Sequence, residues 1–370
     1  MTRPAWIEVD LGAVRANVAS IREQLSPGTR YLAVVKANAY GHGDVPVARA
    51  AVDGGASWLG VVLVDEGARL REAGIEAPIL LMHEPPPDRA GDVVRLGLTP
   101  AVFTEIGAAA LGDAAERAAM AVDVHLKIDT GLNRLGVPLD GLEELARVLV
   151  KEPRLRVQAA WSHFAFPDDP AHPFTDVQLA RFDEACDRLA ALGISPPLRH
   201  IGNSATALAR PDAHLDMVRV GIATYGLAPA PGLDGGVPLL PALSLKARVA
   251  MVRRVPTGEG ISYGHRYRPG SAATIASLPL GYADGWLRSG SGRAHALIGG
   301  RRYPTVGTVC MDSFMIDLGD DSCDVGDEVV LIGAQGSERI AAEEVAVAMG
   351  TINYEVVAAL SSRLDRTYGG

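Results

Sequence analysis

The chain has 370 residues, is 48% hydrophobic and carries a formal net charge of −9 at pH 7. This length exceeds one average domain, and the apolar content is ample for a core, so we expect a large domain and a smaller one. The acidic balance argues against binding to nucleic acids or anionic membranes, because both need a basic patch. A small molecule is the expected partner.

The three cysteines are Cys186, Cys310 and Cys323. Their odd number and their spacing predict neither a disulfide scaffold nor a metal site. The N-terminal stretch MTRPAWIEVDLGAV lacks the apolar core of a signal peptide. Since no stretch approaches the roughly 18 apolar residues needed to cross a bilayer, we expect a cytoplasmic protein without a membrane partner.

From Tyr31 to about Tyr225, short apolar runs alternate with longer amphipathic stretches, a pattern typical of βα units. One such stretch, Asp176 to Leu192, carries apolar residues at helical spacing. The eight apolar runs are residues 31–36, 58–63, 77–82, 98–103, 122–129, 157–164, 198–203 and 217–222. Eight βα units predict a TIM barrel. An open doubly wound sheet is the alternative, but the glycine-rich dinucleotide fingerprint is missing after the first strand.

A proline- and glycine-rich stretch at residues 228–241 separates this region from alternating patterns typical of β-strands. One of them would place Leu245, Ala247, Val249 and Met251 on a single face. The end of the chain reads AAEEVAVAMGTINYEVVAAL, which is helix-like. We therefore expect an α/β protein with a (β/α)8 barrel domain at residues 1–235 and a smaller, mostly β domain at residues 236–370.

Active sites of TIM barrels form at the C-terminal ends of the strands, where polar residues become candidates for chemistry. Lys36 ends the first apolar run in VVKANAYGHG. Apolar surroundings disfavour the charged form of a lysine, and a neutral amine can attack an aldehyde to form a Schiff base. A lysine that reaches solvent from a strand tip is the alternative.

The loops after the seventh and eighth strands are where barrels often bind phosphate. Small residues there allow backbone N–H groups to approach an anion, and Ser204 adds a hydroxyl at the start of a short helix. The candidates are Asn203, Ser204, Arg219, Gly221 and Ile222. Each loop alone could be an ordinary turn, but a phosphate cradle together with a Schiff-base lysine indicates pyridoxal 5'-phosphate.

Eight fragments in this order resemble the alanine racemases, a family of pyridoxal-phosphate enzymes. They are VVKANAYGHG, KIDTGLNRLGV, GNSAT, RVGIATYG, GISYGHRY, PLGYADGW, GTVCMDSFMID and TINYEV. The resemblance covers nearly the whole chain. It implies racemisation of alanine to supply D-alanine for peptidoglycan, on a barrel followed by a β domain.

The resemblance implies two bases, Lys36 and Tyr263, because racemisation removes a proton from one face of the substrate and returns one to the other. It also implies a homodimer in which Tyr263 and Met311 reach the Lys36 of the second chain. Met311 would bind the substrate carboxylate through its backbone. Read without the family, Tyr263 would more often be a packed strand tyrosine.

Arg219 would face the pyridine nitrogen of the cofactor and keep it unprotonated, since a guanidinium cannot accept a proton. His163 would lie between Arg219 and the cofactor ring. Arg134 would contact the substrate carboxylate, and Lys127 matches a lysine that is often carbamylated in the family. Without the family, Arg219 suggests an ion pair near Asp216.

Three further tyrosines receive roles from the resemblance. Tyr40 and Tyr354 correspond to residues that contact the cofactor phosphate, and Tyr282 to a residue at the entry channel.

The nearest rival function is a barrel-type pyridoxal-phosphate decarboxylase, which places a carboxylate, not an arginine, at the pyridine nitrogen. A non-catalytic pyridoxal-phosphate-binding barrel would lack residues 241–370. A racemase of broader or serine-preferring specificity is the closest alternative, because one hydroxyl changes selectivity by only ~1 to 3 kcal/mol in an apolar pocket.

Overall fold

The computed structural model describes residues 4–166 and 168–370. These residues form two compact units. We call the first the barrel unit, which comprises Ala13–Ala39 and Asp44–Leu240. The second, the sheet unit, comprises Tyr40–Gly43, Pro241–Gly370 and the described part of Met1–Gly12. Two short segments from the first part of the chain therefore belong to the same unit as the C-terminal residues. The sequence pattern instead predicted a single boundary after residue 235.

The barrel unit contains a ring of parallel strands in the order β10-β2-β3-β4-β5-β6-β8-β9. Their bounds are β2 Arg30–Val34, β3 Trp58–Val61, β4 Ile79–Leu81, β5 Thr99–Val102, β6 Val122–Asp129, β8 Leu155–Trp161, β9 Leu198–His200 and β10 Met217–Val220. Each lies within or overlaps one of the eight apolar runs. The expected strands are therefore confirmed.

The ring closes between β9 and β10 through backbone hydrogen bonds beside the paired ladder. The Asp216 N–H donates to the Arg199 carbonyl at 3.1 Å, and the Arg219 N–H donates to the Gly202 carbonyl at 3.1 Å. Most strand residues are buried, as expected for parallel strands covered on both faces. The predicted TIM barrel is confirmed.

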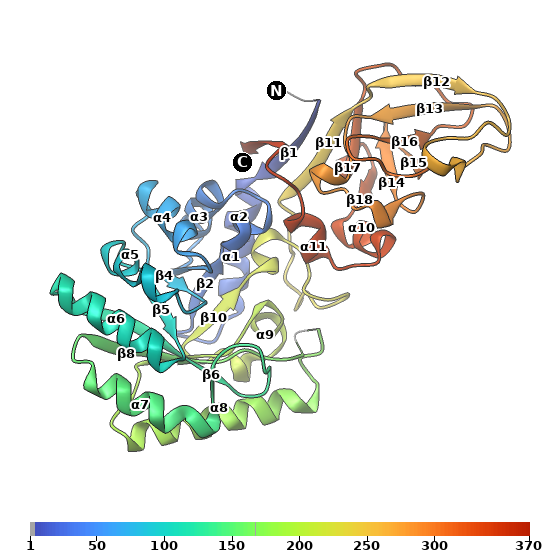
Figure 1. The fold of residues 1–370 in the computed structure, drawn as a ribbon. Helices are drawn as coiled ribbons and strands as arrows, with labels where there is room; N and C mark the ends of the chain where they lie inside the picture. The colour runs from blue at the N-terminus through green and yellow to red at the C-terminus, as the bar shows by residue number, and fades with distance from the viewer. Residues whose placement is uncertain (1–3, 167) are drawn as a thin grey trace. The chain divides into compact units, whose positions relative to one another are not determined.

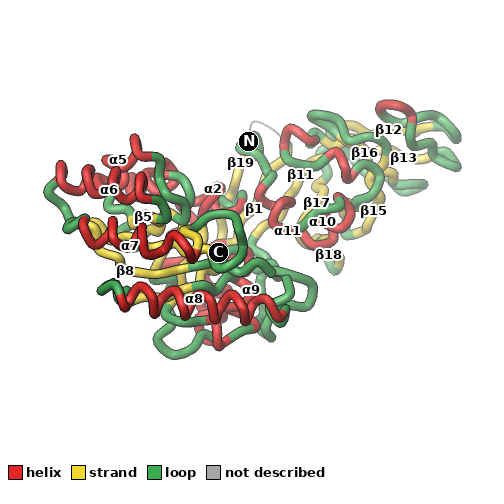
Figure 2. Tube along the Cα trace, turned by 60° about the horizontal axis from the view of Figure 1, so that its bottom comes forward, coloured by secondary structure: helices red, strands yellow, loops and turns green. Residues whose placement is uncertain are grey.

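Helices surround these strands, as Figures 1 and 2 show. They are α1 Leu11–Gln24, α2 Lys36–Tyr40, α3 Asp44–Asp53, α4 Val64–Glu72, α5 Ala90–Arg95, α6 Glu105–Ala118, α7 Leu142–Lys151, α8 Pro173–Ala191 and α9 Ser204–Ala209. In α8, the expected helix at 176–192, Phe182, Ala185 and Leu189 are buried. A short strand, β7 Val137–Pro138, pairs with the end of β6.

The sheet unit has the strand order β12-β13-β16-β15-β14-β17-β11-β1-β19, with β18 beside β17. The bounds are β1 Ala5–Asp10, β11 Leu243–Arg248, β12 Met251–Val255, β13 Ala273–Leu278, β14 His295–Ile298, β15 Arg301–Val306, β16 Phe314–Asp317, β17 Glu328–Gln335, β18 Glu338–Ile340 and β19 Asp365–Gly369. Two helices lie between β18 and β19 in the chain, α10 Ala342–Met349 and α11 Asn353–Ala358, where the helix-like sequence lies. The mostly β second domain is confirmed.

The expected face of Leu245, Ala247, Val249 and Met251 is only partly correct. The first three are buried, but Met251 is 43% exposed. The reason is that β11 ends at Arg248 and Met251 begins β12, so the alternation restarts on another strand.

The N-terminal segment belongs to the sheet unit because β1 pairs antiparallel with β11 and parallel with β19. The segment Tyr40–Gly43 is held by Arg366, whose Nε donates to the Gly41 carbonyl at 2.8 Å. Glycine is required at position 41, since a Cβ there would lie 2.1 Å from the Val357 carbonyl oxygen. Among the described residues, no helix is long and apolar enough to cross a membrane.

Candidate functional site

Lys36 lies two residues beyond β2 and begins α2, a turn of unusual handedness. Ala37, Asn38 and Ala39 have φ values of 52°, 55° and 51°. This left-handed conformation costs about 1 to 2 kcal/mol per residue for side chains other than glycine. The pKa of Lys36 is lowered by burial and by the charge of Arg134, while Glu66 opposes this shift. Lys36 is therefore a half-buried amine that loses its proton more readily than an exposed lysine does.

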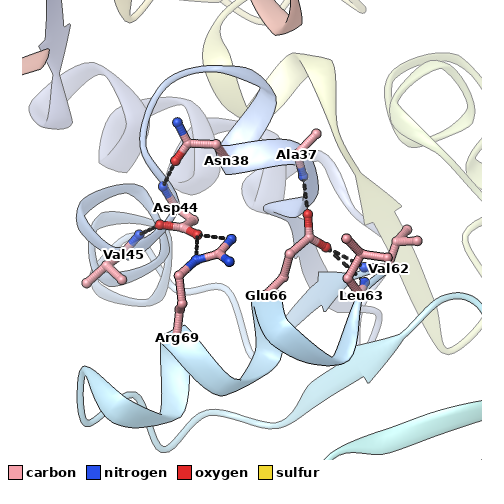
Figure 3. A network of polar contacts seen from close by, with 8 residues as sticks. All are labelled: Ala37, Asn38, Asp44, Val45, Val62, Leu63, Glu66 and Arg69. Carbon is pink, nitrogen blue, oxygen red and sulfur yellow. Dashed lines mark hydrogen bonds and ion pairs between the residues drawn. The ribbon is translucent and has the colours of Figure 1, made fainter. Parts of the chain in front are cut away.

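Glu66, on the first turn of α4, holds the turn after Lys36 (Figure 3). Its Oε1 accepts a hydrogen bond from the Ala37 N–H at 2.7 Å, and its Oε2 accepts from Val62 and Leu63 at 2.8 and 3.0 Å. The side chain is buried, at 6% exposure. One carboxylate thus joins the turns that follow β2 and β3.

Three further cations belong to the same strand ends. Lys127, inside β6, is 4% exposed and lies over the Trp161 ring at 4.4 Å. Burial lowers the pKa of Lys127 to about 7, helped by the charges of Arg219, Arg134 and Lys36. Arg134 is exposed in the loop after β6. Such a cluster attracts anions and favours neutral amines near pH 7.

Arg219, on β10, is 3% exposed. Its Nη1 donates to Nδ1 of His200 at 2.8 Å, and its Nη2 contacts Nδ1 of His163 at 2.9 Å. Nη2 also donates to the carbonyls of Ser162 and Ile201 at 2.8 and 3.1 Å. Burial lowers the pKa of Arg219 to about 9. The expected pairing with Asp216 is not among these contacts, since the Asp216 carboxylate accepts from the Arg199 N–H at 2.8 Å.

The contacts of Arg219 determine which ring nitrogen carries the hydrogen in two buried histidines, His200 and His125. A guanidinium only donates, so His200 accepts at Nδ1 and carries its hydrogen on Nε2. His200 Nε2 then donates to His125 Nδ1 at 3.1 Å, and His125 Nε2 to Gln158 Oε1 at 3.1 Å. Gln158 in turn donates to Asp123 at 3.3 Å. A one-directional chain therefore runs from Arg219 along β9, β6 and β8.

His163 is held from α8. Gln178 donates to the His163 carbonyl at 3.0 Å and accepts from the Ala165 N–H at 2.8 Å. Gln178 also donates to the Thr130 hydroxyl, which lies 2.8 Å from the Ser162 hydroxyl. Burial and the charges of Arg219 and Arg134 keep the pKa of His163 well below its usual range. His163 is thus neutral and carries its hydrogen on Nε2.

The loops after β9 and β10 meet through Ser204. Its hydroxyl accepts from the Gly221 N–H at 2.9 Å. Asn203 is the N-cap of α9, and its Oδ1 accepts from Ala205 and Thr206 at 3.0 and 3.1 Å. Ile222 begins the 3-10 turn η4, Ile222–Tyr225. The four residues expected to surround a phosphate therefore lie on two loops that touch each other.

The remaining candidates lie in the sheet unit. Tyr263 is 73% exposed on the 3-10 turn η5, Tyr263–His265. One hydrogen bond holds its backbone, because the Thr308 hydroxyl donates to the Tyr263 carbonyl at 2.9 Å. The preceding residue is bound to the same segment, since the Ser262 hydroxyl donates to the Thr308 carbonyl at 2.7 Å. The loop, rather than contacts of the ring, places the phenol.

Tyr263, Tyr282 and Met311 line one cavity of about 440 Å³ together with Arg288 and Asp312. The 3-10 turn that carries Tyr282, η6 Tyr282–Asp284, is bound to the Met311 segment, since the Tyr282 N–H donates to the Cys310 carbonyl at 3.0 Å. Gly281 permits this approach, because a Cβ there would lie 2.3 Å from the same carbonyl oxygen.

Tyr40 and Tyr354 form a pair in the sheet unit, with ring centroids 6.2 Å apart. Burial raises the pKa of Tyr40 to about 12, so its hydroxyl stays a hydrogen-bond donor at neutral pH. Among the residues that the structure describes, no group of His, Cys, Asp and Glu side chains is arranged to hold a metal ion.

Sequence reasoning missed four residues of these networks: Glu66, His83, His125 and His200. His83 follows β4, and burial and the charges of Lys127 and Lys36 lower its pKa. His125 lies two residues before Lys127 and so shares its face of β6, which is a signal that could have been used. Glu66 was hard to recognise from the sequence, because the N-cap residue of α4 is Leu63 and not one of the Ser, Thr, Asp or Asn residues that usually mark the start of a helix.

Comparisons with known proteins agree along the whole chain. The family described as "Alanine racemase, N-terminal domain" matches residues 9–229, and "Alanine racemase, C-terminal domain" matches residues 242–368. A relative from Symbiobacterium thermophilum named "Alanine racemase" is 47% identical over 369 residues, which cover 100% of this chain and 98% of that protein. A relative of the same name from Thermobifida fusca is 42% identical over 100% of this chain and 99% of its own length.

Solved structures agree with these matches. The alanine racemase from D-cycloserine producing Streptomyces lavendulae gives a TM-score of 0.94 at 39% identity, covering 100% of this chain and 97% of that one. The alanine racemase from Bacillus anthracis with bound L-Ala-P also gives a TM-score of 0.94, at 38% identity, covering 100% and 95%.

Proposed function

The chain belongs to the alanine racemase family, and we propose that it interconverts L-alanine and D-alanine with pyridoxal 5'-phosphate, using Lys36 and Tyr263 as its two bases. The full-length match at 47% identity to a protein named alanine racemase carries this function. The chemistry of the side chains described above supports the finer assignments.

The residues of the barrel unit fit pyridoxal phosphate. Bound there, this cofactor supplies an aldehyde for an amine and a ring that withdraws electrons from the substrate α-carbon. Lys36 offers the amine with a lowered pKa. The Ser204 and Gly221 loops, which are joined at 2.9 Å, would hold the phosphate with Ile222 and Asn203. Tyr40 and Tyr354, which belong to the sheet unit, are assigned to the phosphate by the family resemblance alone.

Arg219 would donate to the pyridine nitrogen. Of its five N–H groups, the partners His200, His163, Ser162 and Ile201 leave one on Nη1 and the Nε–H available among the described residues. Because a guanidinium cannot give up its proton at neutral pH, the nitrogen stays unprotonated. This limits electron withdrawal and favours racemisation over transamination. A carboxylate, as in the decarboxylases, would do the opposite.

Arg134 would bind the substrate carboxylate, and Lys127 would orient Arg134 once carbamylated. A pKa of about 7 makes the Lys127 amine largely available as the neutral nucleophile that reacts with carbon dioxide. The resulting carbamate is an anion among Arg134, Arg219 and Lys36, and so relieves the repulsion that lowers this pKa.

Lys36 and Tyr263 would act from opposite faces of the bound substrate. One removes the α-proton and the other returns a proton, so the two enantiomers exchange the roles of the two bases. Met311 would donate its backbone N–H to the substrate carboxylate, and Tyr282 would line the entry to the cavity that it shares with Tyr263.

We propose that two chains form a homodimer in which Tyr263 and Met311 of one chain complete the site of the other. Both side chains are exposed on the sheet unit, at 73% and 53%, as a contribution to another chain requires. Free thiols at Cys186, Cys310 and Cys323 fit a reducing, cytoplasmic location. The D-alanine produced would supply peptidoglycan.

One experiment tests the activity and its specificity together. The protein is loaded with pyridoxal phosphate and incubated with separate L-amino acids in heavy water, followed by chiral analysis. We expect D-alanine with deuterium at the α-carbon, and turnover of serine at a much lower rate. Faster turnover of serine than of alanine would establish the alternative, a serine-preferring racemase.

Borohydride reduction then tests the assignment of Lys36. Reduction should fix the cofactor on Lys36, as read by peptide mass. Attachment to Lys127, Lys151 or Lys246 would overturn the assignment, even if the protein racemises alanine.

A mixing experiment tests the shared site. Lys36→Ala and Tyr263→Phe variants should each be inactive, but subunit exchange should restore activity in mixed dimers. Random pairing at equal amounts predicts about a quarter of wild-type activity, because half of the dimers are mixed and each has one intact site of two. Proven subunit exchange without regained activity would reject a site built from two chains.

A further inference from the structure

We propose that Glu66 is a positioning residue for Lys36: its carboxylate holds the left-handed turn at Ala37–Ala39 and so fixes the backbone from which the Lys36 side chain starts. This inference rests on the proposed function, in which Lys36 carries the cofactor and acts as a base. It adds a residue of α4 to the machinery, although Glu66 touches neither substrate nor cofactor.

The contacts of Glu66 divide between two tasks. Oε2 accepts from Val62 and Leu63, which is the usual arrangement for an acidic residue in the first turn of a helix. Oε1 instead crosses to the Ala37 N–H, 29 positions away in the chain, at 2.7 Å (Figure 3). Helix capping alone does not require this second contact. The Ala37 N–H directly follows Lys36, so the bond acts on the residue next to the candidate base.

The turn needs such a restraint because of its residue types. Asn38 adopts the left-handed region with ease, whereas Ala37 and Ala39 do not. Two alanines at φ 52° and 51° flanking Asn38 therefore persist only where surrounding contacts hold them. A buried carboxylate is well suited to this, since a charge-assisted hydrogen bond to a backbone N–H is stronger than a neutral one.

The same helix also contacts the residue that binds Asn38, in the middle of the turn. Asn38 Oδ1 accepts from the Asp44 N–H at 3.1 Å, and Arg69 Nε donates to Asp44 Oδ2 at 2.9 Å. Figure 3 shows Glu66 in contact with Ala37, and Arg69 in contact with Asp44, which in turn contacts Asn38. Arg69 is half-exposed in this pair, at 49% of its side chain, whereas Glu66 is buried. The stronger restraint therefore falls on the Lys36 side.

The chain contains a matched control in Glu84. Its carboxylate accepts from the Phe103 and Thr104 N–H groups at 2.6 and 2.9 Å, next to the first turn of α6. Glu84 thus performs the capping task of Glu66 without any contact to the turn after Lys36. Comparing Glu66→Gln with Glu84→Gln separates positioning from capping.

The experiment measures kcat and KM for alanine in Glu66→Gln, Glu84→Gln and the double variant Glu66→Gln/Ala37→Gly. We expect Glu66→Gln to lower kcat about tenfold with KM changed less than about twofold, and Glu84→Gln to leave kcat within about twofold. Glycine accepts φ of 52° without strain, so Ala37→Gly should restore kcat about threefold in the Glu66→Gln background.

A second measurement uses the cofactor-free protein. Acetylation of Lys36 as a function of pH, mapped by peptide mass, reports the amine directly. Glu66→Gln removes a charge that raises the pKa of Lys36, so the midpoint should fall, and Ala37→Gly should leave that midpoint where Glu66→Gln put it. Rescue of kcat without rescue of the midpoint identifies a positional effect.

Three results would overturn the proposal. An unchanged kcat in Glu66→Gln would reduce Glu66 to a helix cap. A lowered kcat that Ala37→Gly does not restore would make its role electrostatic. If Glu66→Gln does not fold, Glu66→Asp keeps the charge with a shorter reach, and failure of Ala37→Gly to raise its kcat would reject positioning. Cofactor attachment to a different lysine in the wild type would instead overturn the proposed function itself.

Discussion

In the barrel unit, Arg219 is 3% exposed and contacts two imidazoles and two carbonyls, whereas Tyr263 of the sheet unit is 73% exposed. The first side chain is built into the core, and removing it leaves buried acceptors without a donor. The second is presented by a loop whose backbone bonds to Thr308 do not involve the phenol.

In the barrel unit, the same buried side chains should affect both stability and chemistry, whereas at Tyr263 the two should be separable. Inside the barrel, burial shifts the pKa values of Lys127, Arg219, His125 and His200. A pKa that differs between the folded and unfolded states changes the free energy of folding, and it also sets the protonation state available for catalysis. At Tyr263, substitution should affect chemistry alone.

Tyr263→Phe should lower the rate of alanine racemisation by about 10²- to 10⁴-fold, the range for loss of a general acid or base. Its free energy of unfolding should change by less than about 0.5 kcal/mol, as for other exposed substitutions. Chiral rate assays and urea unfolding measure the two effects. A loss of stability above about 1 kcal/mol, as is common for substitutions in a protein core, would place the phenol in a structural role.

Arg219→Met should destabilise the protein by about 3 kcal/mol, because the carbonyls of Ser162 and Ile201 and two imidazole nitrogens lose their donor. Arg254→Met is the control, since the pair of Arg254 with Asp320 is exposed and should contribute less than about 1 kcal/mol. Equal effects of the two substitutions on urea unfolding would contradict the description of Arg219 as part of the core.

The sequence was sufficient for the strands of the barrel, because buried parallel strands are continuous apolar runs that stand out between amphipathic helices. The pairing of β1 with β11 and β19 was out of reach, since it joins residues more than two hundred positions apart and depends on hydrogen bonds that any strand could form.

Within the proposed site, the family resemblance supplied the residues that we assign to the cofactor and the substrate, but not those that contact them from behind. His200 was missed because a buried histidine has no pattern of its own, and only the fold shows that His200 and His125 line up with Arg219. The left-handed turn after Lys36 was missed because alanine normally predicts the right-handed helix.

Lys127 should make stability depend on pH. Its pKa is about 7 in the folded protein and about 10.5 when unfolded. Between these values the unfolded state binds more protons, so the free energy of unfolding should rise with pH, by about 2 to 4 kcal/mol across the window. Urea unfolding of the cofactor-free protein in buffers without carbon dioxide measures this rise.

Lys127→Met is the control for this rise, which it should reduce, since it removes one titrating group while Lys36 and Arg219, whose pKa values are also lowered, remain. Bicarbonate should also reduce the rise if Lys127 becomes carbamylated, because the carbamate no longer binds the proton of the amine. A slope as steep in Lys127→Met as in the wild type would assign the pH dependence to the other groups.

The smallest effect is expected for the two histidines behind Arg219, which should not titrate at all in the physiological range. Burial lowers the pKa of His125 to about 4 and that of His200 well below its usual range, with the charge of Arg219 adding to both shifts. The directional chain from Arg219 to Gln158 also fixes the hydrogen of each ring on Nε2.

Nitrogen-15 NMR of labelled histidine should therefore show neutral Nε2–H tautomers from pH 8 down to about pH 5. Gln158→Leu should disturb the His125 signal more than that of His200, because it removes the acceptor of His125 alone. A titration of either ring near pH 6.5, its ordinary value, would mean that water reaches the chain and that Arg219 is not held as a fixed donor.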